Sequence, residues 1–263
     1  MAGRVEGKVA FITGAARGQG RAHALRLAEE GADIIAIDID TQVENVPYAT
    51  ATAEDLAETV RQVEALDRRI VAETCDVRDL ERLKQVVATG VAELGRLDIV
   101  AGNAGVDIVG PWHSITPEIV RTTIDINLIG VWNSVMAALP HMIEAGNGGS
   151  IVLTSSANGL KAGPWNIAYN MSKYGVTGMT KSFAQELAKD GIRVNSVHPG
   201  GVDTPMAQGI MGVAESGFTK GMEENPLLTG MLTQWIPGMM EPREISNAVL
   251  YLASDESKWV TGH

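Results

Sequence analysis

The 263-residue sequence has one cysteine, few aromatic residues and fewer basic than acidic side chains. The lone Cys75 cannot form an intrachain disulfide, which favours a reducing compartment, and no second thiol or close histidine stands beside it for a metal site. Lys and Arg number 21 against 32 Asp and Glu, so the formal net charge is −11. This charge argues against a basic surface for nucleic acid or for anionic membranes.

Long hydrophobic runs are also absent. No stretch reaches about 18 uninterrupted apolar residues, and the N-terminal segment lacks a charged leader followed by an apolar run and a cleavage site. We therefore expect a cytoplasmic protein without a membrane span. His23, His113 and His141 each lack a second histidine at metal-ligand spacing, so we expect no metal site.

What the sequence does contain is a regular alternation of short β-rich apolar runs and longer segments with helical periodicity. Strands are expected at 9–14, 33–38, 69–77, 97–105, 150–156 and 192–200, and helices at 20–30, 53–66, 79–94, 117–145 and 166–189. This order predicts an α/β fold, namely a Rossmann-like, doubly wound parallel sheet with helices on both faces. No composition shift, linker or repeat interrupts it, so we expect a single domain over 1–263.

Two stretches depart from the alternation. Residues 41–52 form a polar segment after the second strand, where connections usually have about 2 to 6 residues, and this length indicates an insertion. Residues 200–240 hold six of the 11 methionines and lack a sustained period. We interpret this second stretch as a mobile apolar lid.

A glycine-rich turn, TGAARGQG, follows the first strand and precedes a helix. Gly14, Gly18 and Gly20 let the backbone approach a pyrophosphate at a helix N-terminus. An isolated turn of this kind can also serve packing alone. The next strand, however, ends at Asp38, about 20 residues further on, where a carboxylate would bind the ribose hydroxyls of an adenosine.

Asp38 and Arg17 point to different cofactors. A carboxylate at the ribose repels a 2′-phosphate and favours NAD, whereas a guanidinium beside the turn can hold that phosphate and favours NADP. We rank Asp38 above Arg17 because the carboxylate opposes the phosphate directly. Alone, Asp38 could also be a solvated strand-end carboxylate or a cap.

A second group of polar residues lies further along the chain. Tyr169 and Lys173 have i,i+4 spacing on one expected helix, although this spacing also occurs by chance. A nearby ammonium is expected to lower the tyrosine pKa from about 10 toward neutrality, which suits proton exchange with an alcohol or carbonyl oxygen. Ser156 stands at a strand end, where its hydroxyl can bind the reacting oxygen. Because ligands sit at the carboxyl ends of parallel strands, Asp38, Asn103 and Ser156 should face one crevice.

From TGAARGQG through NAG and YNMSK to HPGGVDTP, the chain resembles the short-chain dehydrogenase/reductase family over nearly its whole length. The resemblance implies that the cofactor is bound by Gly14, Arg17, Gly18, Gln19, Gly20, Asp38, Asp76, Val77, Asn103, Ala104, Gly105, Tyr169, Lys173, Pro199, Val202 and Thr204. Within this set, Asp76 and Val77 would contact the adenine, and Val202 and Thr204 the nicotinamide side. It implies that the catalytic residues are Asn127, Ser156, Tyr169 and Lys173.

The resemblance also implies the reaction. Tyr169 would take the alcohol proton while hydride passes from the carbinol carbon to the nicotinamide, and the reverse direction would reduce a ketone. Lys173 would lower the Tyr169 pKa and bind the nicotinamide ribose, Ser156 would position the substrate oxygen, and Asn127 would hold a water in a proton relay to Lys173. The family implies homotetramers formed through 117–145 and 166–189. Its members usually continue through a last strand and a glycine-containing tail, so we expect that tail to be missing or that sheet edge to be reduced.

The insertion at 41–52 resembles the extra segment of the carveol-dehydrogenase-like, mycofactocin-coupled subgroup. In that subgroup NAD stays bound and an external redox carrier re-oxidises it; a surface loop without such a role is the alternative. Together with the lid, this implies an NAD-dependent oxidoreductase for an apolar, terpene-like secondary alcohol such as carveol. Two alternatives stay open: an NADP-dependent carbonyl reductase, which rests on Arg17, and a non-catalytic nucleotide-binding protein, which would have lost part of the serine, tyrosine and lysine set.

Overall fold

The computed structural model describes residues 3–212, 217–232 and 238–263. Six strands form one sheet in the order β3-β2-β1-β4-β5-β6, and every neighbouring pair is parallel. The strand order reverses between β1 and β4, which places a crevice at their carboxyl ends. The strands are β1 (Val9–Thr13), β2 (Asp33–Asp38), β3 (Ile70–Thr74), β4 (Ile99–Gly102), β5 (Gly149–Thr154) and β6 (Ile192–Val197).

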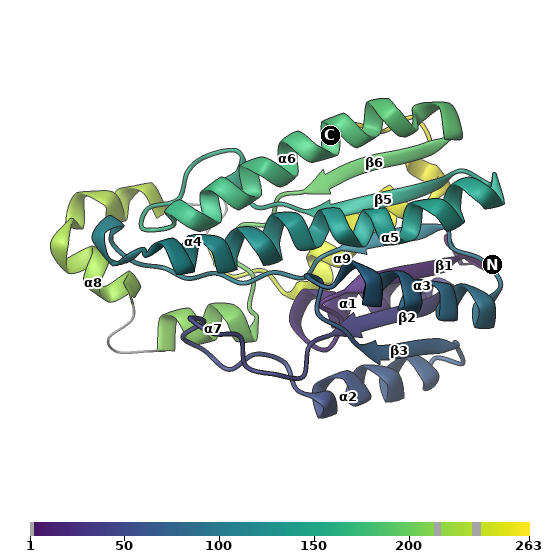
Figure 1. Cartoon of the computed structure of the whole chain (residues 1–263), viewed down its shortest axis with the longest axis horizontal. Coiled ribbons are helices and arrows are strands. Elements are labelled where there is room, and N and C mark those ends of the chain that lie inside the picture. Colours follow the sequence, from purple (N-terminus) through teal and green to yellow (C-terminus); the bar gives the residue numbers. More distant parts are fainter. Residues whose placement is uncertain (1–2, 213–216, 233–237) are drawn as a thin grey trace.

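Helices cover both faces of the sheet (Figure 1). One face carries α1 and α9 with α2 beside them, and the other carries α3, α5 and α6. The predicted α/β, doubly wound fold is therefore confirmed. The helices are α1 (Gly18–Glu29), α2 (Ala53–Glu64), α3 (Leu80–Leu94), α4 (Pro117–Ile124), α5 (Gly130–Ala145), α6 (Ile167–Leu187), α7 (Pro205–Gly212), α8 (Gly217–Glu224) and α9 (Pro242–Ala253). Shorter helical turns are Trp112–Ser114, Asp125–Ile129, Ala157–Gly159, Ala188–Asp190, Pro226–Leu232 and Asp255–Ser257.

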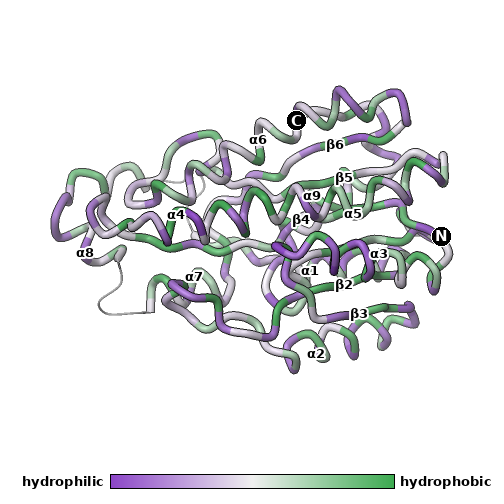
Figure 2. The backbone as a smooth tube through the Cα atoms, in the orientation of Figure 1, coloured by the Kyte–Doolittle hydropathy of each residue, from purple (hydrophilic) through white to green (hydrophobic). Residues whose placement is uncertain are grey.

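The central strands are apolar because both of their faces are buried. Ile35 and Ile37 of β2 pack with the α3, α5 and α6 side, whereas Ile34 and Ala36 pack with the α1 side. This split follows the two-residue period of a strand, whose successive side chains point to opposite faces. Figure 2 shows the hydrophobic residues concentrated along these inner strands.

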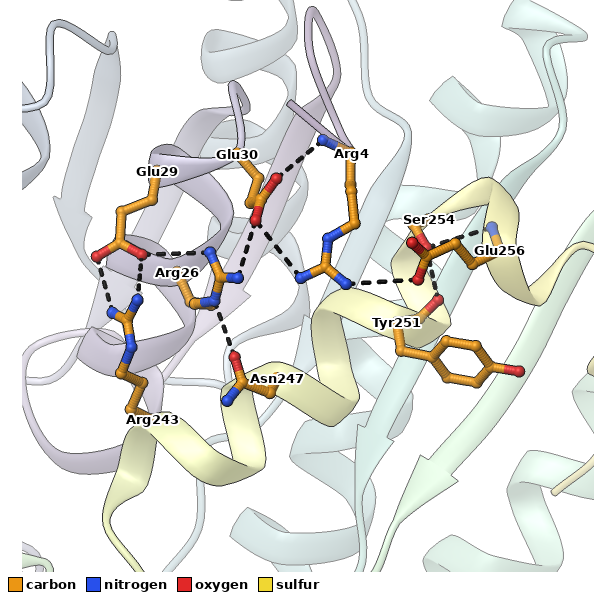
Figure 3. A network of polar contacts seen from close by, with 9 residues as sticks. All are labelled: Arg4, Arg26, Glu29, Glu30, Arg243, Asn247, Tyr251, Ser254 and Glu256. Atoms are coloured by element: carbon orange, nitrogen blue, oxygen red, sulfur yellow. Dashed lines mark hydrogen bonds and ion pairs between the residues drawn. The ribbon is translucent and has the colours of Figure 1, made fainter. Parts of the chain in front are cut away.

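Helix α9 packs along α1 and is an element that the expected alternation did not include. Inside the contact, His23 is fully buried and its Nδ1 lies 2.8 Å from Ser246 Oγ. At the rim, Arg26 and Arg243 both bond to Glu29 in a network of polar contacts (Figure 3). Exposed ion pairs contribute little to the free energy of unfolding, so we attribute most of the stability of the α1–α9 contact to its buried part.

Two expected segments differ in detail from the structure. The single helix expected at 117–145 is interrupted by a π-helical turn, Asp125–Ile129, of the kind that often marks functional sites. The lid at 200–240 contains α7 and α8, which have eight residues each and are too short to produce a sustained period. Residues 213–216 and 233–237 of the lid lie outside the described residues.

The continuous segment Pro117–Ala145 is long and apolar enough to cross a membrane by length and composition. In the structure 61% of its apolar 18-residue stretch is buried inside the protein. It therefore packs as a core helix of the α/β fold.

Candidate active site at the carboxyl edge of the sheet

A cleft of about 1060 Å³, partly open to solvent, lies at the carboxyl ends of the strands. Helices α7 and α8 extend beyond these strand ends (Figure 1). The residues that the sequence predicted for a cofactor and that line this cleft are Gly14, Arg17, Gly18, Gln19, Asp38, Asp76, Val77, Asn103, Ala104, Gly105, Tyr169, Lys173 and Thr204.

The glycine turn forms a cradle that side chains would fill. Gly14 has φ +69°, and a Cβ there would lie 2.9 Å from Ala104 Cα. A Cβ on Gly20 would lie 1.9 Å from the Gly14 carbonyl oxygen, so Gly20 supports the turn from behind the cleft. No side chain caps the start of α1 at Arg17. The turn and the uncapped helix start therefore fit a pyrophosphate.

Asp38 joins the end of β2 to the glycine turn. Its carboxylate accepts hydrogen bonds from the backbone N–H groups of Ala16 (2.9 Å) and Ile39 (2.8 Å). Burial raises the pKa of Asp38, and these two bonds oppose the rise. The Arg17 guanidinium donates to the Ala49 carbonyl of the insertion. Because Arg17 already has this partner, the geometry supports ranking Asp38 above it.

Asp76 and Val77 follow β3 at the same edge. Burial acts to raise the pKa of Asp76, but the side-chain and backbone hydrogen bonds from Arg78 outweigh it and hold the pKa below its usual value. Val77 is buried, and its carbonyl accepts a 2.9 Å bond from Asn133 Nδ2. An anionic and an apolar wall therefore lie side by side in the cleft.

Asn103 and Ala104 connect the ends of β4 and β1. Their backbone N–H groups donate to Thr13 Oγ1 at 3.0 and 3.1 Å, and Asn103 Nδ2 donates to the Thr13 carbonyl at 3.1 Å. Thr13 is a residue that sequence reasoning missed, although it directly precedes the glycine turn. It fixes the loop that carries Gly105 beside α6.

Tyr169, Lys173 and Ser156 come together as expected from their spacing. Lys173 Nζ lies 5.4 Å from the centroid of the Tyr169 ring and donates a 2.8 Å hydrogen bond to the Thr154 carbonyl. The Ser156 side chain is hydrogen-bonded to Tyr169, and its Oγ accepts from the Asn158 N–H at 3.0 Å. The end of β5 thus binds the Lys173 ammonium through the Thr154 carbonyl and carries the Ser156 hydroxyl two residues later.

The expected lowering of the Tyr169 pKa by Lys173 is wrong for the protein chain alone. Burial raises the pKa of Tyr169, the charge of Asp107 raises it further, and the bond with Ser156 opposes these effects only in part. Burial also lowers the pKa of Lys173 to about 8, while Asp107 opposes that change. Desolvation of both groups therefore outweighs the attraction that the i,i+4 spacing suggested.

Asn127 lies in the π-helical turn between α4 and α5 and is fully buried. Its Oδ1 accepts from the Val106 N–H, and its Nδ2 donates to the Val106 carbonyl, both at 2.8 Å. Nδ2 also donates to Ser172 Oγ at 3.2 Å. The side chain thus braces the loop after β4 against α6, and the water relay stays a prediction.

The segment after β6 closes over the glycine turn. The Pro199 carbonyl accepts from the Ala157 N–H at 2.9 Å, which ties it to the loop of Ser156. Val202 is buried and forms a β-bridge with Met240. Thr204 Cγ2 would lie 3.4 Å from a Cβ on Gly18. Pro199 and Val202 support the cleft from outside its lining, whereas Thr204 reaches it.

The insertion is folded onto the cleft. Gln42 Nε2 donates to the carbonyls of Val43 (3.2 Å), Val46 (3.1 Å) and Tyr48 (3.1 Å), and its Oε1 accepts from the Thr50 N–H. Residues of the insertion that line the cleft and that sequence reasoning missed are Val43, Tyr48, Thr50 and Ala51. The apolar residues within this otherwise polar segment were the sequence signal that could have revealed its contact with the cleft.

Helix α7 packs on the insertion, and α8 packs on Trp165 in the loop before α6. A Cβ on Gly209 of α7 would lie 2.4 Å from Tyr48 Cβ, so the helix backbone rests on that tyrosine. Phe218 of α8 makes an edge-to-face contact with Trp165 at 5.3 Å between ring centroids. Trp165 has φ +57°, an uncommon left-handed conformation, directly before α6. The lid's predicted mobility stays a prediction.

Within the described ranges no group of three or more His, Cys, Asp or Glu residues lies close enough to hold a metal ion. Cys75 lines the cleft, and burial raises the pKa of its thiol to about 11. This cysteine is therefore a protonated, apolar wall residue at neutral pH.

The fold and the cleft together define an open α/β protein with a glycine cradle and a serine–tyrosine–lysine group at one sheet edge. The family model described as short chain dehydrogenase matches residues 8–212. The chain therefore belongs to the short-chain dehydrogenase family.

Individual relatives cover almost the whole chain. The (−)-trans-carveol dehydrogenase of Rhodococcus erythropolis is 45% identical over 264 residues, which span 98% of this chain and 95% of that protein. The structure of a short chain dehydrogenase from Mycobacterium paratuberculosis bound to NAD has TM-score 0.96 and 55% identity and covers 99% of this chain and 96% of its own. The structure of carveol dehydrogenase from Mycobacterium avium in complex with NAD has TM-score 0.89 and 50% identity, and the match covers 99% of this chain and 95% of that chain. The predicted resemblance to carveol dehydrogenases is confirmed.

Proposed function

We propose that this protein interconverts a secondary alcohol and a ketone with NAD, using Tyr169 as the acid–base group. The chain is an NAD-dependent dehydrogenase/reductase, in line with its family and with relatives whose structures contain NAD. The single observation that carries the mechanism is the meeting of Ser156, Tyr169 and Lys173 beside the cleft that the glycine turn and Asp38 line.

The residues of the cleft fit NAD in one orientation. The glycine turn would hold the pyrophosphate, and Asp38 the adenosine ribose. Asp76 and Val77 would contact the adenine, and Lys173 the nicotinamide ribose. The other groups that we assign to the cofactor are Arg17, Gln19, Asn103, Ala104, Gly105, Tyr169, Pro199, Val202 and Thr204. Bound NAD supplies the hydride acceptor.

The chain's own residues manage the proton. Ser156 orients the substrate hydroxyl, and Tyr169 takes its proton as the carbinol carbon is oxidised. Because burial raises the pKa of Tyr169, its phenol carries a proton and has to release that proton as it takes the one from the alcohol. The acceptor that we propose is the neutral amine form of the neighbouring Lys173. Lys173 suits this role because its pKa of about 8 lies near neutral pH. Asn127 braces the site and holds the water that leads the proton to solvent.

We infer that NAD stays bound through turnovers and that an external redox carrier, of the mycofactocin kind, re-oxidises it. The support is the packing of the insertion, which lines the cleft beside Asp38 and is covered by α7 through Tyr48 and Gly209. The burial of Val43, Val46 and Tyr48 supports a role for the insertion beyond that of an exposed surface loop.

The substrate that we propose is an apolar, terpene-like secondary alcohol such as carveol. Two of the relatives above are named carveol dehydrogenases. Where the methionine-rich lid reaches the cleft, it provides apolar and adaptable surface, which suits a hydrocarbon ring. Met206 of α7 lines the cleft itself.

We also propose a cytoplasmic homotetramer. The outer faces of the long helices expose large apolar side chains, which mark contact surfaces between protein chains. The exposed large apolar residues on α5, on α6 and on the π-helical turn before α5 are Ile129, Trp132, Ile143, Ile167, Met171 and Tyr174. Light scattering on the purified protein tests the assembly.

The experiment that tests the function combines nucleotide identification with turnover. The protein is dialysed exhaustively and denatured, and the released nucleotide is identified by mass spectrometry; NAD or NADH is expected. A dye acceptor such as dichlorophenolindophenol then replaces the carrier, and oxidation of (−)-trans-carveol to the ketone is followed. Retained NADP would instead establish the NADP-dependent reductase, and dye reduction that needs added NAD would contradict retention.

A further inference from the structure

Arg21 is a partly buried arginine on α1, directly after the glycine turn, and the proposed mechanism gives it no role. Its guanidinium reaches the start of α2, where Nη2 donates to the Asp55 carbonyl at 2.8 Å and Nε donates to Thr59 Oγ1 at 3.0 Å. Nη2 also donates to the carbonyl of Ala16 in the turn. These three bonds place the guanidinium between the turn and α2.

Thr59 completes this contact from the α2 side. Its side chain is fully buried, and its hydroxyl donates to the Ala15 carbonyl at 2.9 Å while it accepts the bond from Arg21. The carbonyls of two successive turn residues, Ala15 and Ala16, are therefore both held on the α2 side of the turn.

The direction of these carbonyls fixes the direction of the N–H groups in the turn. The C=O and N–H of a trans peptide point in opposite directions, and the described ranges contain no cis peptide. The peptide between Ala15 and Ala16 shows the consequence, because its carbonyl is held by α2 and its N–H donates to Asp38 at 2.9 Å. In the next peptide Arg21 holds the carbonyl, so the Arg17 N–H points away from α2. That N–H has no hydrogen-bond partner in the described part of the chain.

The two sides of the turn face different surroundings. Asp38, which receives the N–H of the first peptide, lines the cleft, whereas Asp55 and Thr59 of α2 do not. The Arg17 N–H is therefore directed to the cleft side, next to the uncapped start of α1 at Gly18. Unpaired N–H groups at a helix start bind phosphate oxygens.

We propose that Arg21 is a positioning residue of the cofactor site, which holds the Ala16 carbonyl from behind the turn and so orients the Arg17 N–H toward the pyrophosphate. Thr59 supports it by holding the preceding carbonyl. Because Arg21 also bonds the first turn of α2, directly after the insertion, it ties the glycine turn to the end of the insertion. This inference rests on the proposed function, which assigns the pyrophosphate to this turn.

The direct test compares two ligands that differ only in the diphosphate. ADP and adenosine share the adenine and the ribose, so the ratio of their dissociation constants for nucleotide-free protein measures the contribution of the phosphate site. In Arg21→Met the preference for ADP should fall by about 10-fold, the factor of one hydrogen bond, while adenosine binding stays within about 2-fold of the wild type. Thr59→Val removes no charge and should lower the preference in the same direction, because it removes one carbonyl bond and one partner of Arg21.

Arg26→Met is the matched control on the same helix. The Arg26 guanidinium bonds Glu29, Glu30 and Asn247 at the contact of α1 with α9 (Figure 3). Its loss removes the same charge and several bonds, yet it should leave the preference for ADP unchanged. Both ligands are measured on the same sample, so a smaller folded fraction in a variant does not change the ratio.

Cofactor release extends the test to the holoenzyme. NADH should dissociate about 10-fold faster from Arg21→Met than from the wild type, since one bond to the pyrophosphate is lost. Single-turnover NADH formation from bound NAD should stay within about 2-fold of the wild-type rate, because the acid–base group is unchanged. A general structural defect would not separate release from chemistry in this way.

The outcomes distinguish this inference from the proposed function. An ADP preference that both Arg21→Met and Thr59→Val keep would overturn the positioning role. A preference lost in Arg21→Met alone would also overturn it, because the charge of the arginine would then explain the effect. A wild-type protein that binds ADP no better than adenosine would refute the assignment of the turn to the pyrophosphate, and this inference with it. The expected preferences in a protein that oxidises no secondary alcohol would support the positioning role and refute the proposed reaction instead.

Discussion

The two sides of the cleft differ in how their polar groups are satisfied. On the glycine-turn side, the Asp38 carboxylate accepts two backbone N–H groups, and Asn103 is bonded to Thr13. On the α6 side, Asp107 Oδ1 has no hydrogen-bond partner among the described residues, and burial lowers the pKa of Lys173 to about 8. On the first side most polar groups are paired, although Gln19 Oε1 has no partner among the described residues and burial raises the pKa of Asp38. The second side holds several buried ionisable groups with shifted pKa values.

This difference indicates a division of labour. Fully paired polar groups rigidify a surface and suit the binding of a fixed ligand. Buried, under-paired ionisable groups cost stability and are typical of places where protons move. We therefore expect substitutions on the α6 side to affect chemistry and substitutions on the glycine-turn side to affect binding.

The largest effect is expected from Tyr169→Phe. Loss of the acid–base hydroxyl should slow single-turnover NADH formation by about 10²- to 10⁴-fold, while the nucleotide content stays near that of the wild type. Stopped-flow absorbance measures the rate, and mass spectrometry measures the nucleotide. Tyr174→Phe, on the same helix with its hydroxyl on the Leu160 carbonyl, is the control and should keep the wild-type rate. Turnover that survives in Tyr169→Phe would contradict the assignment of the chemistry to the α6 side of the cleft.

His23 tests whether a buried titratable group away from the cleft affects stability alone. Burial lowers its pKa from 6.5 to about 4, so the unfolded chain takes up the proton first. The stability is full above pH 6.5, declines by about 3 kcal/mol as the pH falls to about 4, and changes no further from this source below that. Urea unfolding measures the free energy of unfolding across this pH range. In His23→Gln the part of the decline that comes from His23 should disappear, whereas His141→Gln should decline as the wild type does.

A changed catalytic rate in His23→Gln would contradict the assignment of the chemistry to the α6 side of the cleft. At neutral pH its single-turnover rate should equal that of the wild type, because His23 contacts Ser246 between α1 and α9 and not the cleft.

Asp38→Asn should weaken the selectivity of the glycine-turn side. Loss of the charge that repels a 2′-phosphate, and of one backbone bond, should reduce the preference for NAD over NADP by about 10- to 100-fold. Equilibrium binding of NADH and NADPH to nucleotide-free protein measures the ratio. Asp79→Asn, at the N-cap of α3, provides a carboxylate control away from the cleft. An unchanged ratio would show that Asp38 does not face the ribose.

The smallest effect is expected where the insertion meets the lid. Tyr48→Phe removes the bond from the Asp107 N–H and should speed NADH release by about 3- to 10-fold. Gly209→Ala should act in the same direction because its Cβ would press on Tyr48, whereas Gly178→Ala, with open space around it, is the control. Release is followed by fluorescence after trapping. Equal release rates in the wild type and the three variants would show that the contact between Tyr48 and α7 does not slow the release of the cofactor.

Features that depend on neighbouring residues in sequence were predictable. The glycine turn, the strand end at Asp38 and the Tyr169–Lys173 spacing lie within single βα units, so the local pattern revealed them. The contact of Tyr48 with Asp107 joins residues 59 apart, and no periodicity encodes it. The pKa of Tyr169 was predicted in the wrong direction because burial, which depends on the whole fold, outweighs one neighbouring charge.

The most direct measurement is one absorbance spectrum of the dialysed protein after addition of (−)-trans-carveol alone. We expect the near-ultraviolet band of NADH, rising to at most one equivalent per chain without added cofactor, and no such band in Tyr169→Phe. If no secondary alcohol produced NADH even after NAD was supplied, the assignment of this cleft to alcohol oxidation would be contradicted.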